Sequence, residues 1–369
     1  MGNLKQLEQD YNSFKNPVMY VKINGKKVKN TDLYFHTIEA VMGTGFEASV
    51  CRIEAEDISA KYENKKLTVD AQIEALFTVG TKLELYLGYD KKSSSKLVFM
   101  GFITTTAFEL SVSNHVTYFV EAMDVKAFMM NNIRSELKKD MKKYSDVVTA
   151  VLNDYSTLFA SKKIDNTDTI KTPIEQYNQS DYDFIVNIAK RVGYMFFVDR
   201  GKVNFIKYSS AKTKCLTVSP CGALKNFRRE LSLNKQVKSV IVRSHDEANT
   251  DKPIEATAKS ADTVGGGSKS AADLSKVISE KMSITIIDNS VRSPAEAQVR
   301  ANAELTRQSM SLINGEITMF GVPDVFPGGI LEVIEMPEDI NGQYLITEVT
   351  HYLHDESYIT TCRFGANKV

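Results

Sequence analysis

Apolar and polar residues alternate along short segments in the first third of the chain. In Val18–Ile23 every second residue is apolar, and Asn24-Gly25, which follows directly, favours a tight hairpin turn. Four more segments alternate or form short apolar runs: Ser49–Glu56, Leu83–Leu87, Leu97–Ile103 and Val116–Met123. Period-two alternation with polar outward positions predicts antiparallel sheet with one buried face. The region from about Pro17 to Lys126 is therefore expected to be one β domain, either a barrel or a sandwich.

The pattern then changes to a helical period. Ser145–Phe159 reads as a helix with Ser145 as its N-cap, and a second helix is expected to begin at Ser180 and to end at Gly193. Asp183, three residues after Ser180, completes a start that resembles a capping box. Two short strands follow, Tyr194–Val198 and Val203–Lys207. These elements predict an α/β insertion.

Strands resume at Ser239–Arg243 and then give way to His245–Asp273, the stretch with the least predicted order. Its Gly265-Gly266-Gly267-Ser268 run is typical of a flexible segment. A helix is expected from Ser293, with proline at its first position and Glu296 at its third. Four strands close the chain: Gly315–Phe320, Ile330–Ile334, Tyr344–Tyr352 and Tyr358–Phe364. The second β domain is thus predicted to be split by a loop and a helix.

Charge and cysteine content narrow the class of protein. Lys+Arg and Asp+Glu both number 46, so the chain lacks the positive excess of a general nucleic-acid binder. The densest basic run, Lys138, Lys139, Lys142 and Lys143, is interpreted as a solvated face. Neither an apolar run long enough to span a bilayer nor a signal-peptide core appears. The four cysteines form no CxxC pair and are predicted to be reduced and structural: Cys51, Cys215, Cys221 and Cys362.

Catalytic patterns are weak throughout the sequence. His351 and His354, followed by Asp355, lack the spacing and helical context of a zinc protease motif. The other histidines, His36, His115 and His245, have no obvious partners nearby, and Gly43-Thr44-Gly45 lacks the third glycine of a dinucleotide loop. Neither a phosphate-binding P-loop nor a GxSxG elbow occurs. The sequence therefore predicts no catalytic residue, no cofactor-binding residue, no metal ligand and no cofactor.

Three stretches, taken in order, resemble the hub proteins of contractile tails. The first is Ile174–Phe184, continuing to Ala189 and Gly193–Phe197, a capped helix followed by an aromatic strand. The second joins Gly80–Gly88 to Phe99–Ile103, and the third joins Gly321–Gly329 to Gly342–Tyr358, where Ser357 departs from the glycine of the family pattern. The chain is similar in this arrangement to the phage late control D family and the N-terminal part of VgrG. Hubs of extracellular injection particles share the arrangement.

The resemblance implies a mainly β fold of class α+β and a division of the chain. Residues 1–130 would form a first tube-like antiparallel barrel, 131–210 an α/β insertion, 211–247 with 300–369 a second, split barrel, and 248–299 a flexible loop and helix. It also implies a non-enzymatic homotrimer, made in a bacterial cytoplasm and assembled into the baseplate of a virion or phage-tail-like particle.

The expected partners follow from the same resemblance. They are the sixfold tail tube, a separate trimeric spike and other baseplate proteins, with no specific nucleic-acid binding and no stable membrane insertion. The separate spike is expected because the chain stops at Val369, soon after the second barrel. Two alternatives stay open: a tail-associated peptidoglycan hydrolase or endopeptidase built on the same scaffold, and a receptor-binding protein of the tail periphery.

Overall fold

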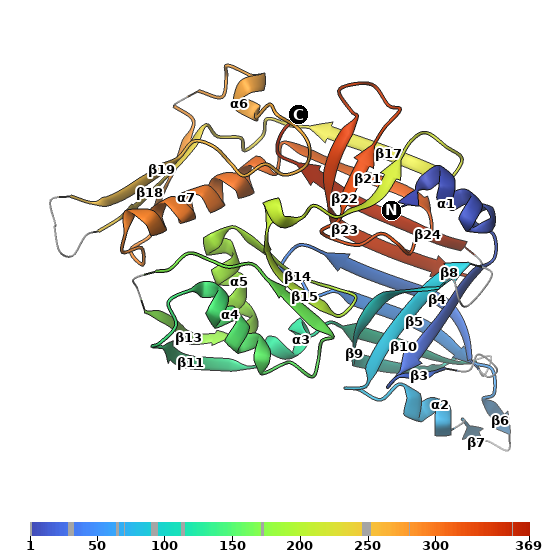
Figure 1. Ribbon diagram of the computed structural model, residues 1–369. Coiled ribbons are helices and arrows are strands. Elements are labelled where there is room, and N and C mark those ends of the chain that lie inside the picture. The colour runs from blue at the N-terminus through green and yellow to red at the C-terminus, as the bar shows by residue number, and fades with distance from the viewer. Residues whose placement is uncertain are drawn as a thin grey trace.

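The computed structural model describes residues 2–28, 33–63, 66–69, 71–89, 95–111, 115–170, 173–245, 252–279, 281–355 and 357–369. Strands outnumber helices, as the sequence predicts, and one 14-stranded sheet dominates the molecule (Figure 1). The first part of the chain contains β1 (Gly2–Asn3), α1 (Leu4–Asp10), η1 (Asn12–Phe14), β2 (Pro17–Ile23), β3 (Lys26–Lys27), β4 (Leu33–Gly43), β5 (Val50–Asp57), β6 (Lys61–Glu63), β7 (Lys66–Thr68), α2 (Ala71–Leu76), β8 (Lys82–Tyr89), β9 (Lys96–Leu110) and β10 (Val116–Met123).

A middle α/β region packs beside the large sheet around its own apolar core (Figure 1). Its elements are α3 (Lys126–Met129), β11 (Ile133–Lys138), α4 (Tyr144–Asn153), β12 (Ser161–Ile164), β13 (Ile174–Ser180), α5 (Asp181–Val192), β14 (Tyr194–Asp199), β15 (Lys202–Lys207) and η3 (Tyr208–Ser210). The predicted start and end of α5 are confirmed. The Ser180 side chain accepts from the Asp183 N–H, and Gly193 ends the helix with φ 72°.

Ser145 is not the N-cap of α4, which was predicted wrongly. Lys143 occupies the cap position, and Ser145 lies within the first turn with its side chain buried. The Ser145 N–H lies in the first turn and has no acceptor within the helix. It donates to Thr167 Oγ1 at 3.1 Å in place of a capping side chain. A residue 22 positions away therefore supplies the hydrogen bond, and local sequence carries no sign of that contact.

The rest of the chain returns to the large sheet and also builds a smaller one. Its elements are β16 (Lys214–Val218), β17 (Leu224–Leu231), β18 (Ser239–Ser244), β19 (Ile254–Ala258), α6 (Ala271–Leu274), β20 (Ser283–Ile287), α7 (Pro294–Ser309), β21 (Ile313–Phe320), β22 (Ile330–Val333), β23 (Gly342–His354) and β24 (Ser357–Ala366). The start of α7 is as predicted, with Ser293 as N-cap and Pro294 in the first turn.

Part of the span expected to be a flexible loop forms secondary structure in the described residues, namely β19 and α6. β19 and β20 flank β18 in a three-stranded sheet, and α7 packs on it through a shared apolar core. β18 was expected in the second β domain, but its partners are β19 and β20. A Cβ on Gly265 would clash with the backbone of Gln343 and a Cβ on Gly267 with the backbone of Lys368, so close packing explains glycine at these two positions. Residues 246–251 lie outside the described residues.

Two five-strand units make up most of the large sheet, and they have the same topology. In the first unit the strands lie in the order β4-β5-β10-β9-β8, and in the second in the order β17-β21-β24-β23-β22. If the strands of each unit are numbered by their order along the chain, both units have the spatial order 1-2-5-4-3. One apolar core runs through both units. The sheet is not purely antiparallel, because β16 pairs in parallel with both β1 and β22.

Local backbone details repeat between the units as well. Gly80 and Gly328 have φ of 86° and 80°, and each donates its N–H across 2.8 Å to an isoleucine carbonyl, of Ile103 and Ile346 respectively. The N–H of the same isoleucine bonds back to the residue after the glycine, at 2.9 and 2.8 Å. Positive φ is the reason why glycine stands at both positions.

β-Bulges repeat at matching places in the two units. β4 and β17 each carry one extra residue, His36 and Lys225, and β9 and β23 each carry an extra threonine, Thr104 and Thr347. A bulge bends its strand and shifts the pairing by one residue. The matching bulges therefore align the two units residue by residue.

Candidate functional site

The two units meet edge to edge, where β23 of the second pairs with β4 of the first. The pairing is antiparallel and runs from Glu348 opposite Gly43 to His354 opposite Thr37. Thr44 extends it by donating its N–H to the Thr347 carbonyl at 2.7 Å. The inward-facing residues of the junction are almost completely buried: Ile38, Ala40 and Met42 on β4, and Val349, His351 and Leu353 on β23. The junction thus makes one sheet out of two units.

Each end of this eight-strand run, from β17 to β9, leaves a strand edge open. Beyond Ile103, the part of β9 from Thr105 to Leu110 pairs with β10 on one side only within the described chain. At the other end β17 pairs only with β21 among the described strands. Both segments carry exposed apolar side chains, Phe108 and Leu110 on β9 and Leu231 on β17. Figure 1 shows β17 in the upper part of the sheet and β9 in the lower part, where β8 continues the sheet beyond the first half of β9.

Charged triads cross the outer face of both units. Arg52 on β5 lies 3.1 Å from Glu39 on β4 and 3.0 Å from Glu121 on β10. In the second unit Arg363 lies 3.5 Å from Glu316 and 3.1 Å from Glu348. The hydrogen bonds to Glu121 and Glu39 raise the pKa of Arg52. Exposed ion pairs of this kind contribute only about 0 to 1 kcal/mol each, so their main effect is on the charge pattern of the face.

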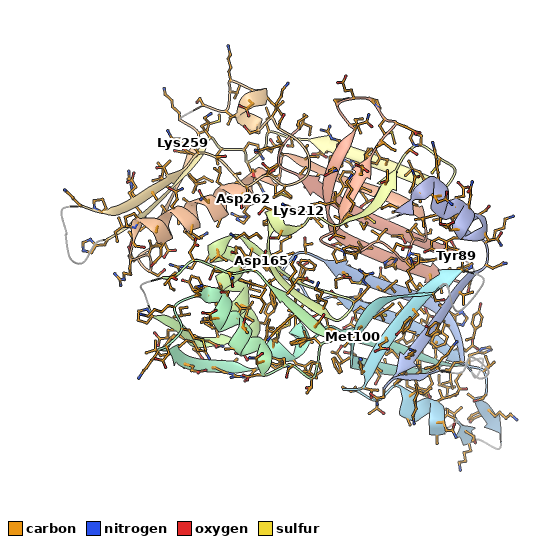
Figure 2. The ribbon with its side chains drawn as sticks, in the orientation of Figure 1. Tyr89, Met100, Asp165, Lys212, Lys259 and Asp262 are labelled. Atoms are coloured by element: carbon orange, nitrogen blue, oxygen red, sulfur yellow. The ribbon has the colours of Figure 1, made fainter. Side chains whose placement is uncertain are left out.

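An aromatic cluster ties the N-terminal segment to both units. The Tyr11 hydroxyl donates to Asp324 Oδ2 at 2.5 Å, and Lys96 forms an ion pair with the same carboxylate. Tyr89, labelled in Figure 2, donates to the Gly321 carbonyl at 2.8 Å. A Cβ on Gly321 would clash with the ring of Tyr358. Burial, and then the Asp324 hydrogen bond, raises the pKa of Tyr11.

A buried charged group joins the first unit to the middle region. Asp124 accepts the Ser49 N–H at 2.7 Å, and the Lys126 ammonium donates to the Glu47 carbonyl at 2.7 Å. Lys126 Nζ also lies 5.2 Å from the centre of the Phe196 ring. Burial raises the pKa of Asp124 and lowers that of Lys126. Nearby, Met100 of β9 packs on Gly201 in the turn between β14 and β15 (Figure 2).

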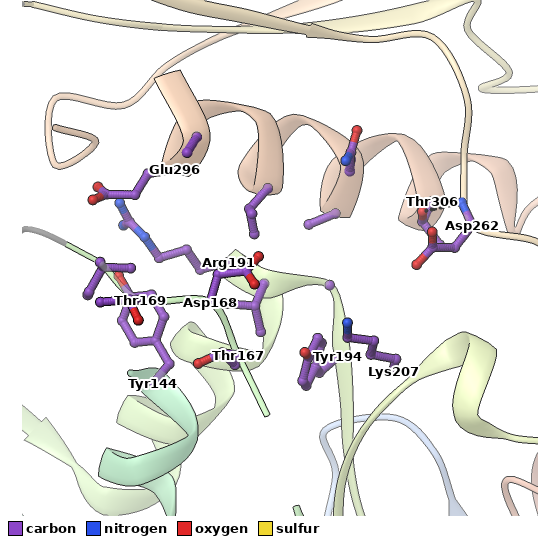
Figure 3. A pocket seen from close by; sticks show the side chains of 17 residues that line it. Tyr144, Thr167, Asp168, Thr169, Arg191, Tyr194, Lys207, Asp262, Glu296 and Thr306 are labelled. Atoms are coloured by element: carbon purple, nitrogen blue, oxygen red, sulfur yellow. Dashed lines mark hydrogen bonds between the residues drawn. The ribbon is translucent and has the colours of Figure 1, made fainter. Parts of the chain in front are cut away.

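A cavity of about 300 Å³ lies between the middle region and α7 (Figure 3). Its walls carry both charges, with Arg191 and Glu296 at one end and Lys207 and Asp262 at the other. The backbone N–H of Asp262 donates to Thr306 Oγ1 on α7 at 3.1 Å. Gly193 lies against the backbone of the helix at Ala303, where a Cβ would approach within 2.8 Å. The cavity is therefore a gap beside a tight contact, without a converging set of catalytic groups among the described residues.

The histidines of the HxxH sequence lie apart in the structure. His351 is buried with Nδ1 2.9 Å from the Tyr358 hydroxyl, and burial lowers its pKa to about 3. His354 is exposed and lies 3.4 Å from Asp355. Among the described residues no group of three His, Cys, Asp or Glu side chains could hold a metal ion.

The structure also shows where the lysine run, Gly43-Thr44-Gly45 and the cysteines lie. The lysine run lies in β11 and the loop before α4 rather than on a helix, and Lys138 pairs with Glu136 at 2.6 Å. Gly43-Thr44-Gly45 lies at the end of β4, where it takes part in the junction with β23. All four cysteines are free thiols, and only Cys221 is not fully buried. No helix in the described chain combines the length and the apolar character that a membrane span requires.

Sequence reasoning missed the two open edges. The sequence predicts no strand over Thr104–Leu110, because the three threonines in a row interrupt the alternation. The only available signal was the late pair Phe108 and Leu110, which continues a period of two. β17 has a similarly weak pattern of mixed charges.

The fold is that of phage tail proteins. The 43 kDa tail protein of prophage MuSo2 from Shewanella oneidensis is similar with a TM-score of 0.68 and 13% identity, over 94% of this chain and 97% of that chain. A tail protein from Neisseria meningitidis MC58 gives 0.67 and 13%, over 95% and 96%. The E. coli protein c3393, a component of the type VI secretion system with structural similarity to the T4 tail proteins gp27 and gp5, gives 0.57 and 14%, over 95% and 76%.

These likenesses confirm the predicted resemblance to tail and secretion proteins at the level of fold. Membership of the late control D or VgrG families stays a prediction. A comparison with curated proteins finds no significant match. Residues 18–355 match a family model described as the Alg8 N-terminal domain, and the chain therefore belongs to the Alg8 N-terminal domain family.

Proposed function

We propose that the protein is a structural hub subunit of a contractile tail or injection particle. In this proposal three copies form a ring in the baseplate, which joins a sixfold tail tube to a separate trimeric spike. The observation that carries the proposal is the internal repeat, two units of the same topology joined edge to edge by β4 and β23. The tail-protein fold of the similar structures supports it.

The repeat would allow a threefold ring to bind a sixfold tube. A ring of three identical chains has threefold symmetry, whereas a sixfold tube presents six equivalent surfaces. Because each chain carries two similar units, three chains offer six such units to the tube and keep three copies of every other element for the spike. Residues 1–130, and 211–247 with 300–369, would be the two tube-like barrels, with 131–210 and 248–299 as insertions. The β18 sheet would then belong to the second insertion.

The particle's own proteins provide the test. The chain is co-expressed with the tube and spike proteins of its particle, and the complexes are weighed by native mass spectrometry. We expect a complex with three copies of this chain that binds both partners. A chain that stays monomeric in the presence of both partners would contradict the proposal.

The proposed role is also non-enzymatic. A zymogram of the purified chain against bacterial cell walls should show no clearing at 41.3 kDa. Clearing at that mass would favour the alternative of a peptidoglycan hydrolase on the same scaffold. Adsorption of the isolated protein to cells would favour a receptor-binding role instead.

A further inference from the structure

We infer that the open edge of β9 in one copy pairs with β17 of a second copy of this chain, in a register set by the internal β23–β4 junction. This inference rests on the proposed ring. β9 is the counterpart of β23 in the repeat, and β17 is the counterpart of β4. The chain thus contains one completed junction, and its two open edges are the two halves of another.

The register follows from matching bulges and matching pairs. Thr105 opposes Glu121 in the first unit as Glu348 opposes Arg363 in the second. In the same way Glu39 corresponds to Arg228, since each follows its bulge by three residues and opposes the matching residue of the next strand. Transferring the β23–β4 pairing places the following residues opposite each other: Thr106 and Leu231, Ala107 and Glu230, Phe108 and Arg229, Glu109 and Arg228, and Leu110 and Phe227.

Exposure distinguishes the open edges from the completed junction. Phe108 and Leu110 are 50% and 42% exposed, whereas their counterparts His351 and Leu353 are 1% and 4% exposed. On the partner edge Leu231 is 47% exposed, and its counterpart Met42 is 2% exposed. Large exposed apolar groups on an open strand edge favour strand addition. Pairing in the inferred register would bury all three on the core side.

Charge fits the same register. Glu109 is exposed on β9, and Arg228, 74% exposed at its side chain, would lie directly opposite it. Opposite charges at directly paired positions stabilise a strand pair, and like charges there weaken it. A slip of one residue would place Phe108 and Leu110, which β10 holds on the core side, beside outer-face residues of β17, and this mismatch makes the register specific.

Disulfide cross-linking of the full chain tests the pairing. Ala107→Cys with Glu230→Cys joins opposed positions on the outer face, in a Cys221→Ser background that removes the one native thiol that is not fully buried. Ala107→Cys with Ser232→Cys is the matched control, two residues out of register on the same face, and it leaves Glu109 and Arg228 unchanged. Thr350→Cys with Val41→Cys, the counterpart pair inside one chain, checks that such a junction can be oxidised.

We expect Ala107→Cys/Glu230→Cys to give a ladder of covalent species that ends at three chains under mild oxidation with the partners present. The out-of-register pair should give at least about tenfold less product, as a fixed register requires. Equal cross-linking of both pairs, or none in a complex that native mass spectrometry shows to hold three chains, would overturn the inference and leave the proposed function standing. A ladder beyond three chains would support the edge pairing but contradict the threefold ring, and absence of any oligomer would contradict both.

Charge reversal gives a second readout that does not depend on cysteine. Glu109→Arg and Arg228→Glu should each weaken association by about tenfold per interface, and the double variant should recover most of the loss. A double variant weaker than either single variant would contradict the inferred pair.

Discussion

Gly80 and Gly328 hold equivalent places in the two halves of the sheet, although they lie 248 positions apart in the sequence. Each has positive φ and donates its N–H across 2.8 Å to the isoleucine at the same strand bend. Their surroundings differ, because a Cβ on Gly80 would meet nothing within 4 Å, while one on Gly328 would lie 2.6 Å from the ring of Phe197. The first glycine is needed for its conformation alone, and the second is needed also for packing on the middle region.

Alanine at these two positions should therefore have unequal effects. Gly80→Ala is expected to lower the free energy of unfolding by about 1 kcal/mol, which is the cost of positive φ for a residue with a Cβ. Gly328→Ala should cost roughly 2 to 4 kcal/mol, because the Phe197 ring must also move. Urea unfolding of both variants measures the difference. Equal losses would contradict the stated role of Gly328.

The Tyr11 hydroxyl should contribute to holding the N-terminal segment in place. Tyr11→Phe removes the donor to Asp324, whose carboxylate keeps the ion pair with Lys96. Loss of a hydrogen bond to a charged group is expected to cost about 1.5 to 3 kcal/mol. Tyr62→Phe, at an exposed position on β6, is the matched control and should change stability by less than about 0.5 kcal/mol. Hydrogen exchange would show faster exchange in α1 for Tyr11→Phe only.

His351 should make the stability depend on pH. Its folded pKa of about 3 lies below the ordinary value of 6.5, and burial is the main cause. The unfolded chain binds this proton below pH 6.5 and the folded chain does not, so stability falls as pH falls. Between pH 7 and pH 5 the loss from this group is about 2 kcal/mol. His351→Asn, which can still accept from Tyr358, should reduce that pH dependence by the same amount, and an unchanged slope would contradict the assignment.

The buried Lys126 should matter for stability far more than an exposed lysine nearby. Lys126→Met leaves the Glu47 carbonyl without this donor and removes the positive charge near Asp124, so a loss of about 2 to 4 kcal/mol is expected. Lys190→Met is the control, because Lys190 is exposed and only approaches the Phe46 ring, at 5.2 Å. Thermal unfolding of the two variants compares them. A similar small effect for both would show that the buried ammonium is dispensable.

Local signals in the sequence predicted local structure well. The caps of α5 and α7 follow from Ser180, Gly193 and Ser293, because each capping bond joins residues only a few positions apart. Period-two alternation correctly predicted a mainly β chain, because it too depends only on neighbouring residues. The sequence was misleading at Gly265–Gly267, where glycines that look like a linker allow close approach to Gln343 and Lys368.

Long-range pairing could not be predicted in this way. The β4–β23 junction joins residues about 300 positions apart, and the sequence of neither strand identifies the strand with which it pairs. The open edges were missed because alternation is weak there, and because an edge is defined by the strand that is absent. The bulges at Thr104 and Thr347, which lie far apart in the sequence, mark these edges as equivalents of the two paired strands.

Electron microscopy of the assembled particle, with the chain labelled by a small C-terminal tag, tests the hub role most directly. We expect three labels per particle, arranged with threefold symmetry in a ring between the end of the tube and the spike. Six labels in that ring, or labels along the tube or at the particle's periphery, would contradict it.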